Sequence, residues 1–98
     1  MNSDILLALK SVIDPELGIN VVDLGLVHRA THVQDGIEVA LAVTSPACPL
    51  GELMVEEATV ALRAHFPEAK SIRVELMRHV SWSPERMSEE GRRQLGLS

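Results

Sequence analysis

The sequence predicts an α/β domain of the α+β kind, in which helices pack on a small mixed three-stranded sheet in the order α-β-β-α-β-α. Two observations carry this prediction. Apolar and small or polar residues alternate strictly over 37–44, directly after an Asp-Gly dipeptide, as in the second strand of a hairpin. A helical apolar pattern over 50–62 is then followed by another alternating stretch, which predicts a right-handed crossover to a parallel strand. With 98 residues, we expect one domain over 1–98.

The first element is predicted to be a helix that Asn2 or Ser3 caps. Its apolar residues recur at helical spacing: Ile5, Leu6, Leu9, Val12 and Ile13. Proline disfavours helical geometry in the residue before it, so we expect the helix to stop at Asp14. Residues 15–18 then form a turn.

The middle of the chain predicts a hairpin and a long helix. A strand is expected over 27–33, a tight turn at Asp35-Gly36 and the alternating strand after it. Residues 44–49 break that strand, and Pro49 suits the first turn of the long helix, which ends at Phe66-Pro67. The core-facing stripe of that helix is predicted to contain Leu50, Leu53, Met54, Ala58, Ala61 and Leu62.

The last third of the chain predicts one more strand and a short helix. Apolar residues alternate with other side chains over 72–77, which indicates the third strand. The tail over 83–97 is expected to form a turn and a short helix, capped by Ser88 and ended by Gly96.

Composition excludes several classes of function. Only 2% of the residues are aromatic and the net charge is −5, which argues against nucleic-acid binding. No apolar run approaches the roughly 18 residues of a membrane helix. A single cysteine cannot form an internal disulfide, and we expect a soluble, cytoplasmic protein with no nucleic-acid or membrane partner.

Cys48 is the most informative residue for chemistry. It directly precedes Pro49 at the predicted start of the long helix, where unpaired N–H groups and the helix dipole favour a thiolate. Glu52 opposes this by like-charge repulsion. The alternative is that Cys48 is a small buried apolar group, as many lone cysteines are.

Three carboxylates, Asp14, Glu16 and Asp23, precede the first predicted strand. They could be metal ligands or the polar rim of a site, or they could be ordinary turn residues. The histidines predict no metal site. His28 and His32 would share a strand face but lie roughly 13 Å apart, too far for joint chelation.

Three ordered motifs resemble the iron–sulfur cluster assembly domain family that includes PaaD and SufT. Residues 14–17 (DPEL) and 22–27 (VDLGLV) are similar to its opening motif, 44–49 (TSPACP) to its Thr-x-x-x-Cys loop, and 82–88 (WSPERMS) to its closing segment. The resemblance runs from about residue 4 to residue 97. The chain lacks the additional C-terminal cysteines of PaaD-type members.

The resemblance implies a factor that assembles, transfers or targets iron–sulfur clusters to client apoproteins, with Cys48 as its reactive cysteine and transient metal ligand. It implies that Asp14, Glu16, Asp23 and Thr44 surround that cysteine. A stable cluster needs about four protein ligands, so a cluster held by this chain would be transient, bridging a homodimer or completed by a partner. Two alternatives stay open: an interaction adaptor with an inert cysteine, docking through the Trp82 segment, and a thiol-dependent enzyme.

Overall fold

The three strands form a mixed sheet in the computed structural model, which describes residues 1–44, 51–80 and 82–96. Its strands are β1 (Val27–Val33), β2 (Gly36–Ala42) and β3 (Ser71–Met77), in the spatial order β1-β2-β3. β1 runs antiparallel to β2, and β2 runs parallel to β3, as the sequence predicts. The prediction of an α+β fold in the order α-β-β-α-β-α is confirmed.

The hairpin turn differs by one residue from the prediction. Asp35 has the positive φ, 62°, while Gly36 is the first residue of β2 and pairs with both Val33 and Ser71. A Cβ atom on Gly36 would collide with the Ser71 hydroxyl, so glycine is needed there because the neighbouring strand is close.

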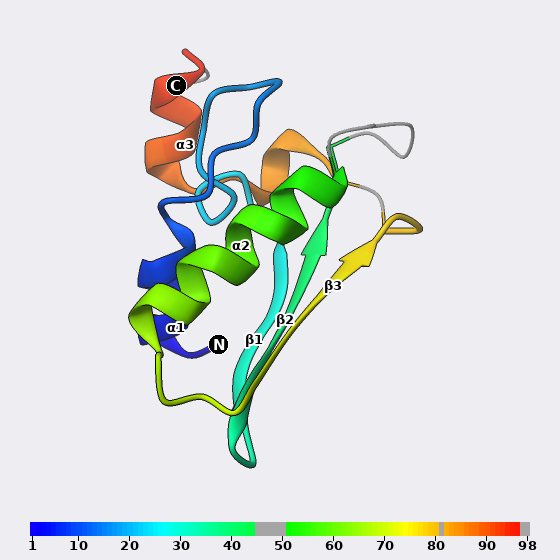
Figure 1. The fold of residues 1–98 in the computed structure, drawn as a ribbon. Helices are drawn as coiled ribbons and strands as arrows, with labels where there is room; N and C mark the ends of the chain where they lie inside the picture. The colour runs from blue at the N-terminus through cyan, green and yellow to red at the C-terminus, as the bar shows by residue number, and fades with distance from the viewer. Residues whose placement is uncertain (45–50, 81, 97–98) are drawn as a thin grey trace.

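The helices pack against the sheet, and loops lie at the ends of the strands (Figure 1). α1 spans Ser3–Leu9 and α2 spans Gly51–His65, and α2 packs over the sheet in contact with β3 and α1. Both faces of β2 are buried, which explains why it is the most apolar strand. The largest fully buried side chains are aliphatic: Ile5, Leu9, Leu24, Leu26, Ile37, Leu41, Met54, Leu62, Val12, Val21, Val39 and Val43.

The first helix is shorter than the sequence predicts. Asn2 caps it as expected, its Oδ1 accepting from the Ile5 N–H at 3.0 Å, but α1 ends at Leu9 and not at Asp14. The next residues pair with the chain that returns beside them: Val21 N–H donates to Val12 C=O, and Ile13 forms a bridge with Asn20. This extended pairing turns Ile13 outward, leaving it 45% exposed.

The C-terminal segment packs on the connection before β1. It contains a 3₁₀ helix, η1 (Pro84–Arg86), and α3 (Glu89–Gln94). The predicted cap is confirmed, because Ser88 Oγ accepts from the Gly91 N–H at 3.0 Å. Gly96 follows α3 with a φ of +78°. The predicted start of the long helix around Pro49 lies outside the described residues.

Candidate functional site

Asp14 closes the turn that follows the first helix. Its Oδ1 accepts from the N–H groups of Glu16 at 2.8 Å and Leu17 at 3.1 Å, an Asx turn. The whole residue is buried, and its second oxygen, Oδ2, contacts no donor among the described residues. A buried carboxylate oxygen without a donor lowers the stability of the fold. The Asx turn therefore explains the place of Oδ1 but not that of Oδ2.

Thr44, two residues after the end of β2, also has a buried side-chain oxygen without a partner among the residues described. Its Oγ1 is buried and has no hydrogen-bond partner in the described part of the chain. Over residues 1–44, 51–80 and 82–96, only one other buried side-chain atom lacks a partner, His28 Nε2. Two of these three atoms therefore belong to residues that the motifs single out.

These residues lie at one end of the molecule. Ala42 N–H donates to Leu26 C=O at 2.7 Å, which joins the start of β1 to the end of β2. The connection containing Asp14 lies at the same end (Figure 1). Glu16 shares the Asx turn and is exposed. Cys48, the central residue of the predicted site, lies outside the described residues, in the segment between β2 and α2.

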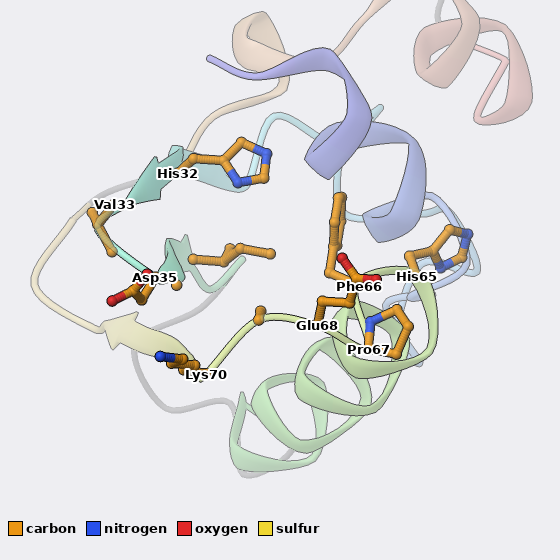
Figure 2. A pocket seen from close by; sticks show the side chains of 11 residues that line it. His32, Val33, Asp35, His65, Phe66, Pro67, Glu68 and Lys70 are labelled. Carbon is orange, nitrogen blue, oxygen red and sulfur yellow. The ribbon is translucent and has the colours of Figure 1, made fainter.

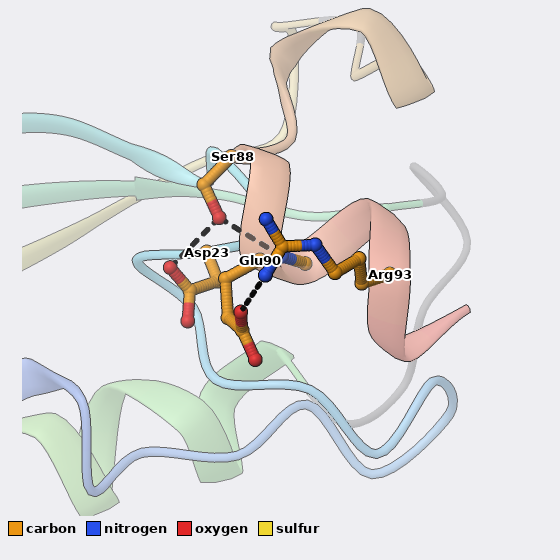
Figure 3. A network of polar contacts seen from close by, with 5 residues as sticks. Asp23, Ser88, Glu90 and Arg93 are labelled. Carbon is orange, nitrogen blue, oxygen red and sulfur yellow. Dashed lines mark hydrogen bonds and ion pairs between the residues drawn. The ribbon is translucent and has the colours of Figure 1, made fainter. Parts of the chain in front are cut away.

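Asp23 is held by two side chains and by its backbone; Figure 3 shows its contact with the Ser88 hydroxyl. Its Oδ1 accepts from the Ser88 hydroxyl at 2.8 Å and its Oδ2 from the Asn20 amide at 2.7 Å. Ser88 N–H also donates to Asp23 C=O at 2.8 Å. Burial raises the pKa of Asp23, but these two hydrogen bonds and the charge of Lys10 outweigh it and hold the pKa below its ordinary value.

Trp82 anchors the same segment. Its Nε1 donates to Leu24 C=O at 2.6 Å, and its half-buried ring packs against the core. Part of the indole is therefore used inside the fold, and docking through the Trp82 segment stays a prediction. Asp23 and Trp82 together fasten the C-terminal segment to the connection before β1.

His28 is a polar residue of this region whose place the sequence does not reveal. A bulge between Val27 and Arg29 breaks the strand alternation. Arg86 Nη2 donates to His28 Nδ1 at 3.3 Å. Burial, and then the Arg86 charge, lower the pKa of His28 below its ordinary value. The imidazole is thus held neutral at physiological pH.

A separate pocket of about 510 Å³ lies at the opposite end of the sheet, between the hairpin tip and the α2–β3 connection (Figure 2). The His32 and Phe66 rings meet edge to face there, 5.5 Å apart. His65 points away from His32 on the other side of Phe66. No three His, Cys, Asp or Glu side chains within the described ranges are grouped to bind a metal ion.

Among the described helices, none combines the length and apolar character needed to span a membrane.

The fold and its site define a small α+β domain with two buried side-chain oxygens, on Asp14 and Thr44, that lie at one end of the sheet and have no partner within the described ranges. A family model described as "Iron-sulfur cluster assembly protein" matches residues 2–76, and the chain belongs to that family. It is 36% identical to "Fe-S protein maturation auxiliary factor YitW" of Bacillus subtilis (strain 168), over 99% of this chain and 95% of the relative.

One more relative and one solved structure are similar to most of this chain. "Fe-S protein maturation auxiliary factor SufT" of Staphylococcus aureus (strain USA300) is 35% identical over 89% of this chain and 99% of its own. The crystal structure of a domain of unknown function, DUF59, from Bacillus anthracis superposes with a TM-score of 0.89 at 33% identity, covering 98% of this chain and 92% of that one.

Proposed function

We propose that this protein is a maturation factor for iron–sulfur proteins that works through Cys48, passing a cluster to client apoproteins. Family membership supports the general role in iron–sulfur cluster assembly. Two relatives that match nearly the whole chain bear the name of maturation auxiliary factors, which supports action on other proteins.

The position of Cys48 in the sequence supports a reactive thiol. It precedes Gly51, the first residue of α2, by three positions. A cysteine just before a helix has its thiolate stabilised by the helix dipole and by unpaired N–H groups, and the thiolate is the form that binds iron and attacks electrophiles.

A cluster would be cargo of this protein and not a resident cofactor. The chain has one cysteine, whereas a stable cluster takes about four protein ligands. The remaining ligands would come from a client, a donor protein or a second copy of the chain. Transient binding of this kind suits a factor that must release its cluster.

The observation that carries the proposal is the pair of unpartnered buried atoms, Asp14 Oδ2 and Thr44 Oγ1. Each unsatisfied buried polar group costs about 1–3 kcal/mol. The Thr44 hydroxyl, which has no partner in the described fold, can donate to a thiolate, whereas the Asp14 carboxylate oxygen can accept from a donor group or bind a metal ion. We assign Thr44 and Asp14 to the surroundings of Cys48, together with Glu16 and Asp23.

The test uses a substitution that separates function from stability. Thr44→Val removes the hydroxyl at nearly constant shape, so stability should stay unchanged or rise by about 1 kcal/mol while activity falls. Thr59→Val is the matched control, since the Thr59 hydroxyl donates to Val55 C=O at 2.8 Å within α2. Activity is read as the specific activity of an iron–sulfur dehydratase in cells that depend on this factor.

Cys48→Ala should abolish that activity, and Cys48→Ser should not restore it. Anaerobic reconstitution with iron and sulfide should give cluster absorption for the wild type and none for Cys48→Ala. If Cys48→Ala supports full dehydratase activity, the cysteine mechanism is wrong.

A second candidate, an adaptor that only recruits clients, is favoured by one observation. Leu53 and Val60 on α2 are 43% and 65% exposed, although apolar. An adaptor would keep its activity in Cys48→Ala and lose it when those apolar side chains are replaced.

A further inference from the structure

An apolar groove runs along α2 on the side away from its core-facing residues. We call it the α2 groove; its volume is about 680 Å³. The residues that line it include Ile13, Pro15, Leu53, Glu56, Glu57 and Val60.

The groove exists because α2 has two apolar faces. Met54, Ala58 and Leu62 are buried in the core. Leu53 is predicted to join them but is 43% exposed, and Val60, seven residues later, is 65% exposed. Residues seven apart stand two turns apart on one helix face, about 10.5 Å along the axis. Exposed apolar residues at this spacing are typical of the seam of a helix that pairs with another helix.

The other wall of the groove comes from the segment after α1. Ile13, turned outward by its bridge with Asn20, is 45% exposed and faces the groove beside Pro15. Three large apolar side chains from two separate segments therefore converge on one hollow. Single exposed apolar residues are common on protein surfaces, but a converging set rimmed by charge marks an interaction site.

The rim of the groove is acidic. Glu56 and Glu57 lie between Leu53 and Val60 on the helix, and neither has a salt-bridge partner in the portion of the chain that the structure describes. The whole chain carries a net charge of −5. Two such grooves placed face to face would bring four glutamates together, which disfavours a second copy as the occupant.

We propose that the α2 groove binds an amphipathic helix of a partner protein, whose apolar face is flanked by lysine or arginine. Leucine-like side chains of that helix would sit between Leu53, Val60 and Ile13, and its cations would pair with Glu56 and Glu57. The inference rests on the proposed function in one respect, that the chain acts on another protein.

The groove would bring that partner to the candidate site. Ile13 and Pro15 flank Asp14 directly, and Leu53 follows Cys48 by five residues in the sequence. A helix bound along α2 would therefore end close to the Asp14 turn.

The test measures binding of two labelled peptide probes by fluorescence anisotropy. Both are helices of about five turns with leucines on one face. One has lysines on both flanks, and its twin has glutamates at the same positions. The lysine peptide should bind saturably, and more weakly as salt rises, while the glutamate peptide should not bind.

Groove variants locate the binding. Leu53→Ser combined with Val60→Ser should weaken the lysine peptide roughly tenfold or more. Val33→Ser is the matched control, because Val33 is 40% exposed but lines the pocket at the other end of the sheet. Glu56→Gln with Glu57→Gln should weaken binding severalfold and flatten its salt dependence, whereas Glu52→Gln, exposed on α2 outside the groove, should not. Val60→Arg, at the most exposed of the three large apolar side chains of the groove, is a second variant and should also weaken binding of the lysine peptide.

Four results would overturn the inference. They are failure of both peptides to bind, equal binding of the two peptides, binding that the groove variants leave unchanged, and a dimer in sedimentation that Leu53→Ser and Val60→Ser convert to monomer. Because the readout is peptide binding, Cys48→Ala should leave it intact, so failure here is distinguishable from failure of the cysteine mechanism.

Discussion

Replacing Gly91 by alanine tests how closely α3 packs against the connection before β1. By helix propensity alone, alanine should stabilise α3 by about 1 kcal/mol. However, a Cβ atom at Gly91 would lie 2.6 Å from Asp23 O and 3.1 Å from Asp23 C, and ordinary contact begins at 3.4 Å. The helix would have to move away from Asp23 by about 0.8 Å.

That displacement would break the attachment of α3 to Asp23. The two Ser88 hydrogen bonds to Asp23 are both 2.8 Å long and would no longer be within bonding distance. A neutral hydrogen bond contributes about 1 kcal/mol and one to a carboxylate about 2 kcal/mol. After the gain in propensity, we expect Gly91→Ala to destabilise the protein by about 2 kcal/mol, which lowers Tm by roughly 10 °C.

Urea unfolding followed by circular dichroism and by Trp82 fluorescence measures this effect. The single tryptophan lies in the same C-terminal segment, so it also reports local detachment. Gln94→Gly, at an exposed position of α3, measures what helix propensity is worth there and should lose at most about 1 kcal/mol. A Gly91→Ala protein as stable as the wild type, or more stable, would refute the packing argument.

Three further outcomes follow from the same region. The folded-state pKa of Asp23 is below its ordinary value, so its contribution to stability is present above the unfolded pKa of about 4 and is lost as pH falls through the folded pKa. Asp23→Asn should therefore reduce the loss of stability at acidic pH, measured by urea titrations at a series of pH values. Burial and the Arg86 charge depress the His28 pKa, which should therefore rise toward 6.5 in Arg86→Gln when the imidazole is titrated by NMR. In the wild type, the free energy of unfolding should fall as pH drops from about 6.5 to the folded-state pKa. Trp82→Phe should cost about 1–3 kcal/mol in chemical denaturation, since Leu24 C=O loses its 2.6 Å donor.

Local pattern was enough to predict the sheet and most of the helices. The alternation over 37–44 corresponds to β2, which spans Gly36–Ala42, and the helical stripe over 50–62 to α2, which spans Gly51–His65. The failures in the two longer helices have one cause: periodicity reports that a residue is apolar, not what covers it. Val12 and Ile13 continue the spacing of α1, yet they pair with the returning chain, and Leu53 lies on a helix face that the sheet does not cover.

The site was predictable only as a set of motif positions. An Asx turn at Asp14 follows from Asp-Pro chemistry, but the isolation of its Oδ2 depends on the packing around it. One partner of Asp23 is Ser88, 65 residues away, and His28 meets Arg86 over 58 residues. No local spacing contains such contacts, because the tertiary fold alone brings these residues together.

The two faces of α2 connect these observations. Met54, Ala58 and Leu62 tie the helix to the core, so its position relative to the sheet is set by burial. The α2 groove on the other face is built from the same rigid helix, with Ile13 and Pro15 on either side of Asp14. A partner that binds the groove would therefore meet a surface whose distance from Asp14 and from the first turn of α2 is already determined. Under the proposed function, such preorganisation would hold a client helix at a fixed distance from the Asp14 turn before any cluster is passed on.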